Sequence, residues 1–230
     1  TVSHNSTAGF SIGTYTGNGT AGATVGHGLG ATPDVLIVKE RGNTNSWVFS
    51  HKDLTDQSGY YLLLNSTGAQ ATDNWFNNTS PTSTVFSTNS TPTNRSSGTY
   101  VFYAFKEVKG FSKFGKWTGN GNADGPFVYT GFRPAFVMIK SSSTSANWQV
   151  YNNKRPSYGN NINLKMGFNK ENIENGSDFG NTSQNNIDML SNGFRCTTSN
   201  TDTNSSQTYF YWAVAEHPLV SSTGIPTVAR

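Results

Sequence analysis

The sequence predicts an all-β protein made of two tandem, homologous, antiparallel β-sandwich domains of a jelly-roll or lectin-like kind. Composition is the first reason: 13% of the 230 residues are charged and 24 are Gly, whereas about a quarter of an average domain is charged. Aromatic residues are the second reason, because at 13% of the chain they can bury enough apolar area to exclude a disordered chain. The third reason is a repeat with a period of about 100 residues, which indicates two copies of a whole domain.

The repeat consists of blocks of similar sequence that recur in the same order. The second copy is longer than the first between Trp148 and Tyr209. The matched blocks are 13–19 with 115–121, 33–39 with 134–140, Trp47 with Trp148, and 100–107 with 209–216. This alignment predicts an N-terminal extension over 1–8, a first sandwich over 9–107, a linker at 108–109, a second sandwich over 110–218 and a C-terminal extension over 219–230.

The strands are predicted from short runs of β-branched and aromatic residues that end at turn-forming residues. In the first copy these runs are 34–39, 46–49, 60–64, 84–86 and 99–105, and in the second they are 135–140, 193–197 and 209–216. The run Tyr-x-x-Tyr-Ala-x-x-Glu at 100–107 has aromatic residues at helical spacing, but its four successive large residues favour a strand that is buried on both faces. Only 170–175 has the pattern of a helical turn, so we expect little helix.

Asn-Gly pairs mark the turns, because these residues adopt positive φ more readily than others. The pairs occur at 18–19, 120–121, 175–176 and 192–193. Those at 18–19 and 120–121 belong to the repeated blocks. We therefore expect each of these two turns to join the first two strands of its sandwich.

Signals for membrane insertion and secretion are missing from the sequence. No run approaches the roughly 18 apolar residues that a membrane span requires, so we expect no membrane insertion. The N-terminus has neither the basic nor the hydrophobic stretch of a signal peptide, and Thr1 fits either removal of an initiator Met or a fragment. Cys196 is the only cysteine, which excludes an intrachain disulfide, and we interpret it as a small apolar filler of its strand.

The charge of the chain argues against nucleic acid as a partner. The formal net charge is +3, and four lysines near the predicted linker form the only cluster of basic residues. Four lysines without a stripe of arginines are more typical of a solvated linker than of a surface that reads anions. The four are Lys106, Lys109, Lys113 and Lys116.

The sequence has no recognisable catalytic or metal-binding constellation. Its histidines, at 4, 27, 51 and 217, show no metal-ligand spacing. A sandwich glycosidase needs two carboxylates that face each other across a cleft. The only acidic residues matched between the copies are Glu107 and Glu216, which end the last strand of each copy, and we expect them to tie down a loop. We therefore expect no catalysis, no metal and no cofactor.

Binding of carbohydrate fits the composition better than catalysis. Amides and hydroxyls match sugar hydroxyls, while an exposed ring can stack on the C–H face of a sugar. Trp47 and Trp148 recur inside apolar strands, which favours core packing over a role as exposed platforms. Asn74, Trp75 and Phe76 lie among loop residues and have no counterpart in the second copy. They are the expected ligand-binding residues, with a loop anchor tucked into the protein as an equal alternative for Trp75.

The repeated motifs also carry a family resemblance. They are Gly9 to Gly19 with Gly110 to Gly121, Thr32 to Lys39 with Gly131 to Lys140, the two tryptophans at 47 and 148, Asn192 to Phe194, and the two closing blocks. Over about residues 9–218 the chain resembles a duplicated domain of unknown function found in structural proteins of tailed phages, especially marine ones. The first copy departs from the pattern, with Thr84-Val85-Phe86 in place of Asn-Gly-Phe. The resemblance implies a virion-surface component, often tail-fibre-like or lectin-like, and it transfers no catalytic or binding residues.

Three functions follow as hypotheses. The first is a phage virion surface protein, located on the particle, that works as a tail-fibre-like adhesin and attaches to a host-surface glycan without catalysis. Its expected partners are other virion proteins and further copies of itself, in a trimer or ring. The alternative is a capsid-decorating or connector protein of the virion, and the third hypothesis is a glycan-degrading enzyme.

Overall fold

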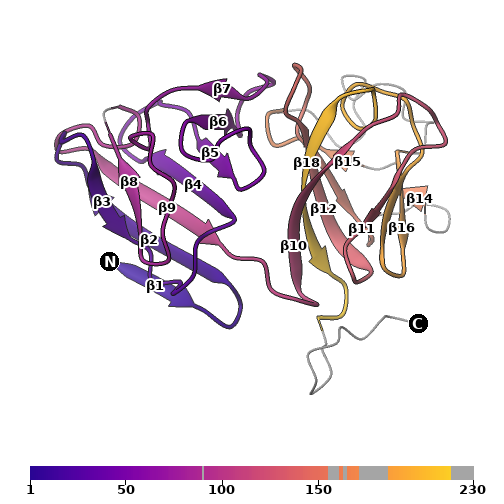
Figure 1. The fold of residues 1–230 in the computed structure, drawn as a ribbon, viewed down its shortest axis with the longest axis horizontal. Coiled ribbons are helices and arrows are strands. Elements are labelled where there is room, and N and C mark those ends of the chain that lie inside the picture. The colour runs from indigo at the N-terminus through magenta and orange to yellow at the C-terminus, as the bar shows by residue number, and fades with distance from the viewer. Residues whose placement is uncertain (90, 155–160, 163–164, 171–185, 219–230) are drawn as a thin grey trace. The chain divides into compact units, whose positions relative to one another are not determined.

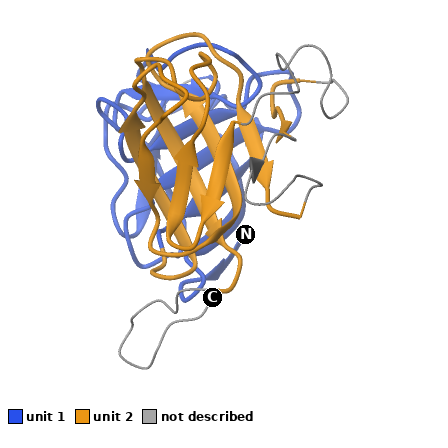
Figure 2. Ribbon diagram, turned by 90° about the vertical axis from the view of Figure 1, so that its right-hand side faces the viewer, with its two compact units in different colours: residues 1–107 blue, residues 108–230 orange. Residues whose placement is uncertain are grey.

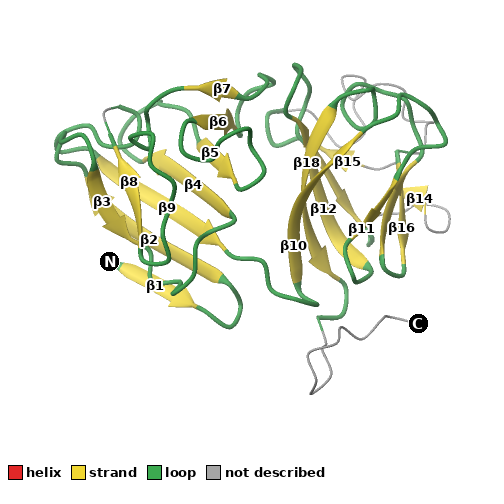
Figure 3. Cartoon of the chain, viewed as in Figure 1, coloured by secondary structure: helices red, strands yellow, loops and turns green. Residues whose placement is uncertain are grey.

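The computed structural model describes residues 1–89, 91–154, 161–162, 165–170 and 186–218. Every regular element within these ranges is a β-strand, and all the strand pairs are antiparallel (Figure 3). The chain divides into two compact units, unit 1 over Thr1–Glu107 and unit 2 over Val108–Arg230 (Figure 2). The prediction of an all-β, antiparallel protein is confirmed, while the predicted helical turn at 170–175 falls mostly outside the described ranges.

Unit 1 contains a seven-stranded sheet, in the order β1-β2-β9-β4-β5-β6-β7, and a separate pair of strands, β3-β8 (Figure 1). The strands are β1 (Val2–Asn5), β2 (Phe10–Thr16), β3 (Ala23–Gly26), β4 (Val35–Glu40), β5 (Val48–His51), β6 (Tyr60–Leu63), β7 (Ala71–Thr72), β8 (Val85–Thr88) and β9 (Thr99–Phe105). Side chains from both sheets meet in one core, where Phe102 of β9 and Phe86 of β8 lie edge to face with their ring centroids 5.2 Å apart. Unit 1 is therefore sandwich-like, because two sheets enclose a shared apolar layer.

Unit 2 contains a five-stranded sheet, in the order β10-β18-β12-β13-β15, and a four-stranded sheet, in the order β11-β17-β16-β14. The strands are β10 (Ser112–Thr118), β11 (Phe127–Tyr129), β12 (Pro134–Ser141), β13 (Gln149–Asn152), β14 (Asn161–Ile162), β15 (Lys165–Met166), β16 (Ile187–Leu190), β17 (Gly193–Cys196) and β18 (Thr208–Ala215). Its core also joins both sheets, since Tyr211 of β18 and Phe194 of β17 lie 5.6 Å apart between ring centroids. Unit 2 has the same two-layer arrangement as unit 1.

The long last strand of each unit shows how the sequence produces this arrangement. In β9, Tyr100, Phe102 and Ala104 are buried, whereas the residues between them are half-buried, which is the period of two that a strand requires. In β18, the residues at 209, 210 and 211 are 0%, 3% and 5% exposed. Burial on both faces is therefore found at the start of β18, whereas the prediction for 100–103 is confirmed for one face of β9 only, because Val101 and Tyr103 are half-buried.

The repeated Gly-Asn-Gly turn is held by a buried asparagine from the loop that precedes the last strand of its unit. In unit 2, the side chain of Asn204 is fully buried, its Nδ2 donates to Asn120 Oδ1 at 2.9 Å, and its Oδ1 accepts from Asn120 N at 3.2 Å. In unit 1, Asn94 makes the same two hydrogen bonds with Asn18, at 2.9 and 3.0 Å. We call each pair, Asn204 with Asn120 and Asn94 with Asn18, an asparagine clasp.

The two glycines of each turn are required for different reasons. A Cβ atom at Gly119 would lie 2.1 Å from the carbonyl oxygen of Ser205, so no side chain fits at the first glycine. Gly121 has a φ of 67°, in the left-handed region that glycine adopts without strain. Its N–H donates to the carbonyl oxygen of Asn204 at 2.8 Å. The turn of unit 1 meets the same two constraints, which explains why both glycines recur.

The turn crosses from one sheet of its unit to the other instead of joining two paired strands. It connects β2 to β3 in unit 1 and β10 to β11 in unit 2, and in each case the two strands belong to different sheets. In unit 2 it joins the first two strands, as predicted. In unit 1 it joins the second and third, because residues 1–8, expected only as an extension, include β1, which pairs with β2.

The two repeated tryptophans differ in burial. Trp148 is 1% exposed, which confirms its predicted place in the core. Trp47 is half-buried, and its ring stacks on that of Tyr103 with centroids 6.4 Å apart. The prediction for Trp47 is therefore confirmed only in part, since one side of its indole remains near the surface.

Replacing Asn204 with Ala is expected to lower the free energy of unfolding of unit 2 by about 3 kcal/mol or more, because several backbone and side-chain groups lose their buried partner at once. Urea denaturation of the variant measures the loss. The matched control is Asn43→Ala, since Asn43 is exposed and its replacement should change stability by about 0.5 kcal/mol or less. Equal unfolding curves for the two variants would contradict a structural role for the clasp.

Candidate functional site

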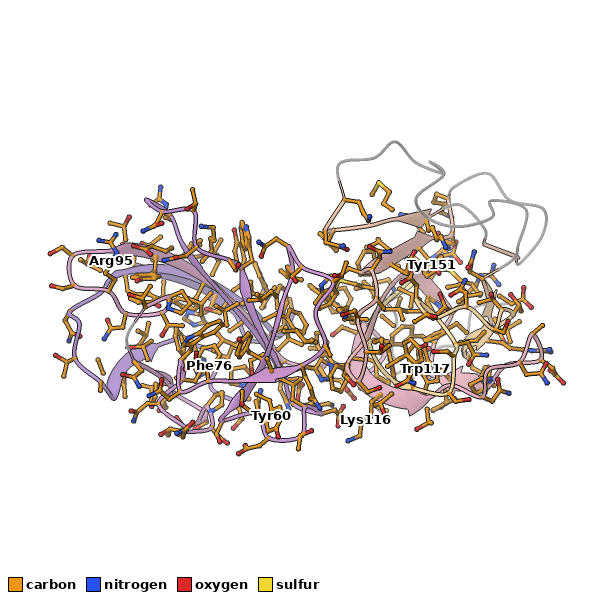
Figure 4. All side chains as sticks on the ribbon, turned by 90° about the horizontal axis from the view of Figure 1, so that it is seen from above. Tyr60, Phe76, Arg95, Lys116, Trp117 and Tyr151 are labelled. Carbon is orange, nitrogen blue, oxygen red and sulfur yellow. The ribbon has the colours of Figure 1, made fainter. Side chains whose placement is uncertain are left out.

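The structure separates the three residues predicted to bind ligand. Phe76 is 4% exposed and lies in the core of unit 1 (Figure 4), so its ring is not available at the surface. Trp75 is half-buried, and its ring centroid lies 3.9 Å from that of Tyr61. Asn74 is exposed. The expected exposed ring platform at this segment is thus corrected, and Trp75 is the tucked-in loop anchor that was the alternative.

Hydrogen bonds to the backbone explain why this loop turns inward. The carbonyl oxygen of Trp75 accepts from Asn89 N at 3.0 Å and from Thr93 Oγ1 at 2.6 Å. These bonds fix the segment against the loop after β8, and the following side chain, that of Phe76, then points into the core. Such partners lie far away in sequence, and therefore the local pattern of polar residues did not reveal them.

Asn74 contributes to a shallow depression beside β6 and β7. The depression encloses about 290 Å³. Its walls are polar and contain no aromatic ring; they come from Gly59, Thr72, Asp73, Asn74 and Asn78. Asn77 and Asn78 both have positive φ, 56° and 46°, which folds the segment tightly around the site. The depression can offer hydrogen bonds to hydroxyl groups, but it offers no stacking surface.

Two exposed rings of the described residues lie on β11 of unit 2, and a third, that of Phe168 at 56% exposed, lies in the turn after β15. Phe127 is 46% exposed and Tyr129 is 58% exposed, whereas Val128 between them is 6% exposed and belongs to the core. The alternation of a strand therefore turns two aromatic rings outward and one apolar side chain inward. Together with Arg195 and Asp124, these two rings form what we call the aromatic face.

Polar groups lie directly beside the two rings. Arg195 on β17 is the partner of Phe127 in the strand register, and its Nη2 donates to Asp124 Oδ1 at 2.5 Å. Tyr129 faces Gly193, where a Cβ atom would lie 2.8 Å from the ring of Phe127, so glycine leaves room for that ring. Rings beside a guanidinium and a carboxylate combine a stacking surface with donors and acceptors.

A lysine completes the surroundings of Tyr129. The ammonium of Lys113 lies 5.2 Å from the centroid of the Tyr129 ring, a distance typical of a cation–π contact. This contact helps to fix the orientation of a ring that is otherwise largely in solvent. It also uses Lys113, one of the four lysines near the linker, while Lys106 pairs with Asp34 at 3.0 Å.

The sequence contains a local pattern that indicates the aromatic face. Phe127-Val128-Tyr129 alternates ring, aliphatic, ring directly after Gly125-Pro126, which is the pattern of a strand with one face in solvent. Unit 1 has Thr24 and Gly26 at the same register positions, on either side of Val25. Residues that the two copies share are mostly core residues. The two exposed rings occur in one copy only, so the repeat does not indicate them.

The two matched carboxylates form ion pairs. Glu107 Oε2 lies 3.1 Å from Lys52 Nζ. Glu216 accepts from Lys154 Nζ at 2.7 Å and from Arg133 Nε at 3.0 Å, and the hydrogen bond from Lys154 is the main cause that lowers the pKa of Glu216. Each glutamate holds the chain after the last strand to loops of its own unit, as the sequence predicted.

The fully buried carboxylate of Glu40 also has a structural role. Its Oε1 accepts from Arg95 Nε at 2.7 Å and from Arg95 Nη2, and its Oε2 accepts from Asn45 Nδ2 at 2.6 Å. The hydrogen bond to Glu40 raises the pKa of Arg95. With both oxygens engaged, Glu40 anchors the loop that carries the clasp residue Asn94.

The thiol of Cys196, the only cysteine, is buried and has a structural place in the core. Burial raises the pKa of Cys196 to about 12, so its thiol stays protonated, and its predicted place as an apolar filler of β17 is confirmed. Within the described ranges, no three His, Cys, Asp or Glu side chains come close enough together to hold a metal ion. In the same part of the chain, no helix is long and apolar enough to cross a membrane.

Comparison with known protein families identifies the family of this chain. Residues 1–218 match the model of a family described as a domain of unknown function (DUF7483). No curated protein and no solved structure matches the chain.

Truncation of a buried aromatic residue should lower the free energy of unfolding more than truncation of an exposed one. Phe76→Ala is expected to cost about 3 to 5 kcal/mol of stability, because it empties a core position. Phe127→Ala should cost about 1 kcal/mol or less, because nearly half of this side chain is already in solvent. Urea denaturation of both variants checks this difference, and a large loss for Phe127→Ala would show that the ring is part of the core.

Proposed function

We propose that this chain, which belongs to DUF7483, a family described as a domain of unknown function, is a phage virion surface protein, as its resemblance to a domain of tailed-phage structural proteins implies. We further propose from its surface chemistry that it acts as a tail-fibre-like adhesin. It attaches to a glycan on the host surface and catalyses no reaction. The observation that carries this proposal is the aromatic face, where Phe127 and Tyr129 stand in solvent beside Arg195 and Asp124.

Phe127 and Tyr129 are exposed at alternate positions of one strand, so both rings lie on the same face of β11 and are not singly scattered. The stability of unit 2 gains little from rings that are 46% and 58% exposed. A pyranose ring has an apolar C–H face and a rim of hydroxyls, which match an aromatic plane and its polar neighbours. The mild net charge of +3 favours an uncharged or weakly charged glycan over nucleic acid.

We also propose that the two units arose by tandem duplication of one lectin-like sandwich. The support is internal: Tyr15 stacks on Tyr100 with centroids 4.8 Å apart, and Trp117 stacks on Tyr209 with centroids 5.1 Å apart. Phe86 opposes Val25 in unit 1 as Phe194 opposes Val128 in unit 2. The departure from the Asn-Gly-Phe motif in the first copy therefore leaves the position of the phenylalanine unchanged.

Duplication does not double the proposed glycan site, since unit 1 lacks the rings. Multivalent attachment then requires several copies of the chain, which we propose to assemble as a trimer or ring with other virion proteins. Presenting shallow sites together can raise the overall affinity by about 10² to 10⁴ when the geometry permits. Weak binding by one site is therefore compatible with firm attachment of a particle.

A capsid-decorating or connector role is the second candidate, and one observation favours it. Strand β1 forms an edge of the seven-stranded sheet, and all four of its residues are exposed, with Val2 40% exposed. Such an edge can pair with a strand of a neighbouring subunit. A glycan-degrading enzyme remains the third candidate, and product analysis distinguishes it from both.

The proposal predicts that the double variant Phe127→Thr, Tyr129→Ser loses host-cell binding by about tenfold or more, because its stacking surface is gone. The double variant should stay folded, with a loss of unfolding free energy of about 2 kcal/mol or less, since truncating each exposed ring costs about 1 kcal/mol or less. Flow cytometry with labelled protein measures the binding. The matched control, Asn74→Ala with Asn78→Ala, alters the depression beside β6 and β7 and should bind as the unmodified protein does.

Three outcomes would contradict the adhesin role. Full binding by the double variant would remove the aromatic face from the site. Reducing ends released from host polysaccharide would favour the enzyme. No binding at all to host cells, together with particles that fall apart when the protein is deleted, would favour the capsid or connector role.

A further inference from the structure

A buried lysine and a buried asparagine meet between the two sheets of unit 2. Lys165 on β15 is 5% exposed, and Asn186, directly before β16, is 2% exposed. The Nζ atom of Lys165 lies 3.3 Å from Asn186 Oδ1. β15 is an edge strand of the five-stranded sheet, whereas β16 belongs to the four-stranded sheet. This contact therefore spans the two layers of the sandwich-like unit.

The groups around the pair supply what a reaction between them needs. Asn200 Nδ2 donates to Asn186 Oδ1 at 2.9 Å, which polarises the carbonyl group of that amide. The carboxylate of Asp202 acts electrostatically on the Lys165 amine, and it is held by Asn147 N at 2.7 Å and by Gln149 Nε2 at 2.9 Å. Burial lowers the pKa of Lys165, against the opposing effect of Asp202, so a neutral, nucleophilic amine is easier to form than at the surface.

Unit 1 fills the same place with two aromatic residues. The carbonyl oxygen of Trp75 accepts from Asn89 N at 3.0 Å, as that of Asn186 accepts from Thr197 N at 3.0 Å. Tyr61 on β6 then stands where Lys165 stands on β15, as the strand registers show. An aromatic pair with centroids 3.9 Å apart thus replaces the lysine and asparagine. An apolar solution exists in this fold, and unit 2 has a costly buried amine in its place.

We propose that Lys165 and Asn186 join in an intramolecular amide cross-link, an isopeptide bond between Nζ and Cγ that the folded unit forms by itself. The Lys165 ammonium first gives a proton to the Asp202 carboxylate. Its neutral Nζ attacks Cγ of Asn186, and Asn200 Nδ2 stabilises the negative charge that develops on Oδ1. The Cγ–Nδ2 bond then breaks as the amide nitrogen takes up one proton from Nζ and one from Asp202, and it leaves as an ammonium ion.

The reaction balances without an oxidant or a co-reactant. One ammonium and one primary amide become one secondary amide and one ammonium ion. Folding supplies the driving geometry, because it holds nucleophile and carbonyl in contact in a site of low water content. The product removes a buried charge and ties the two sheets together across a separation of 21 positions in the sequence.

Intact-mass spectrometry of the purified full chain tests the cross-link. The expected mass is lower than the mass of the sequence by one ammonia, and the expected digest contains a peptide with Lys165 linked to one with Asn186 and no tryptic cleavage after Lys165. Lys165→Arg and Asn186→Ala should each restore the full mass, and Asp202→Asn should slow or abolish the loss. The matched control is Lys140→Arg, because Lys140 is also fully buried in unit 2 and also acted on by Asp202; this variant should keep the ammonia loss.

Two results would overturn the proposal. One is an unmodified mass for the unaltered chain together with free tryptic cleavage after Lys165. The other is an ammonia loss that persists in Lys165→Arg, which would assign it to succinimide formation at an Asn-Gly pair such as Asn192-Gly193. The first result needs no variant, so it decides the question even if a variant fails to fold.

Discussion

The side chain of Asn204 is the interaction on which most of unit 2 depends. It is fully buried and ties its own loop to the distant Gly-Asn-Gly turn: its Nδ2 donates to Asn120 Oδ1 at 2.9 Å and to the carbonyl oxygen of Asn122 at 2.8 Å. The same Nδ2 donates to the carbonyl oxygen of Thr198, six positions earlier, at 2.8 Å. A primary amide is suited to this position because it donates and accepts at once. The repeated Gly-Asn-Gly turn supplies the acceptors and the donor that this amide needs. Its first glycine allows the backbone of the turn to approach the backbone of the loop that carries Asn204.

Both proposed features of unit 2 lie on segments that this clasp fixes. The chain that leaves Asn122 leads through Asp124 into β11 and its two rings, and Thr198 follows β17, which carries Arg195. The loop that contains Asn204 also carries Asn200 and Asp202, the two groups placed around Lys165 and Asn186. In unit 1 the equivalent loop carries Arg95, which neutralises the buried Glu40. The two clasps therefore lie on loops that also carry Asn200 and Asp202 of the proposed cross-link site in unit 2 and Arg95 of the buried ion pair in unit 1.

The sequence predicted what depends on local pattern and on repetition. Strands such as β4, β9, β12 and β18 lie where apolar runs indicated, and the ion pairs of Glu107 and Glu216 hold the chain as expected. It did not predict what depends on partners distant in sequence. Phe76 turns inward because Asn89 and Thr93 donate hydrogen bonds to the backbone of Trp75. The local sequence does not indicate that Lys165 is buried, because Asn186 and Asn200 are distant from it in sequence. The rings of Phe127 and Tyr129 were visible as an alternating run, but a strand of three residues is too short to stand out beside the longer repeated blocks.

Native-state hydrogen exchange of the Gly19 and Gly121 amides, followed by NMR, tests most directly whether each clasp is an integral part of the core of its own unit. These N–H groups donate to the carbonyl oxygens of Asn94 and Asn204 at 3.0 and 2.8 Å. If the clasps are integral to the cores, both amides exchange as slowly as those of β9 and β18, because they open only when their unit unfolds. Exchange as fast as that of an exposed loop residue such as Asn43 would contradict this account and would reduce the repeated turn to an ordinary surface connection.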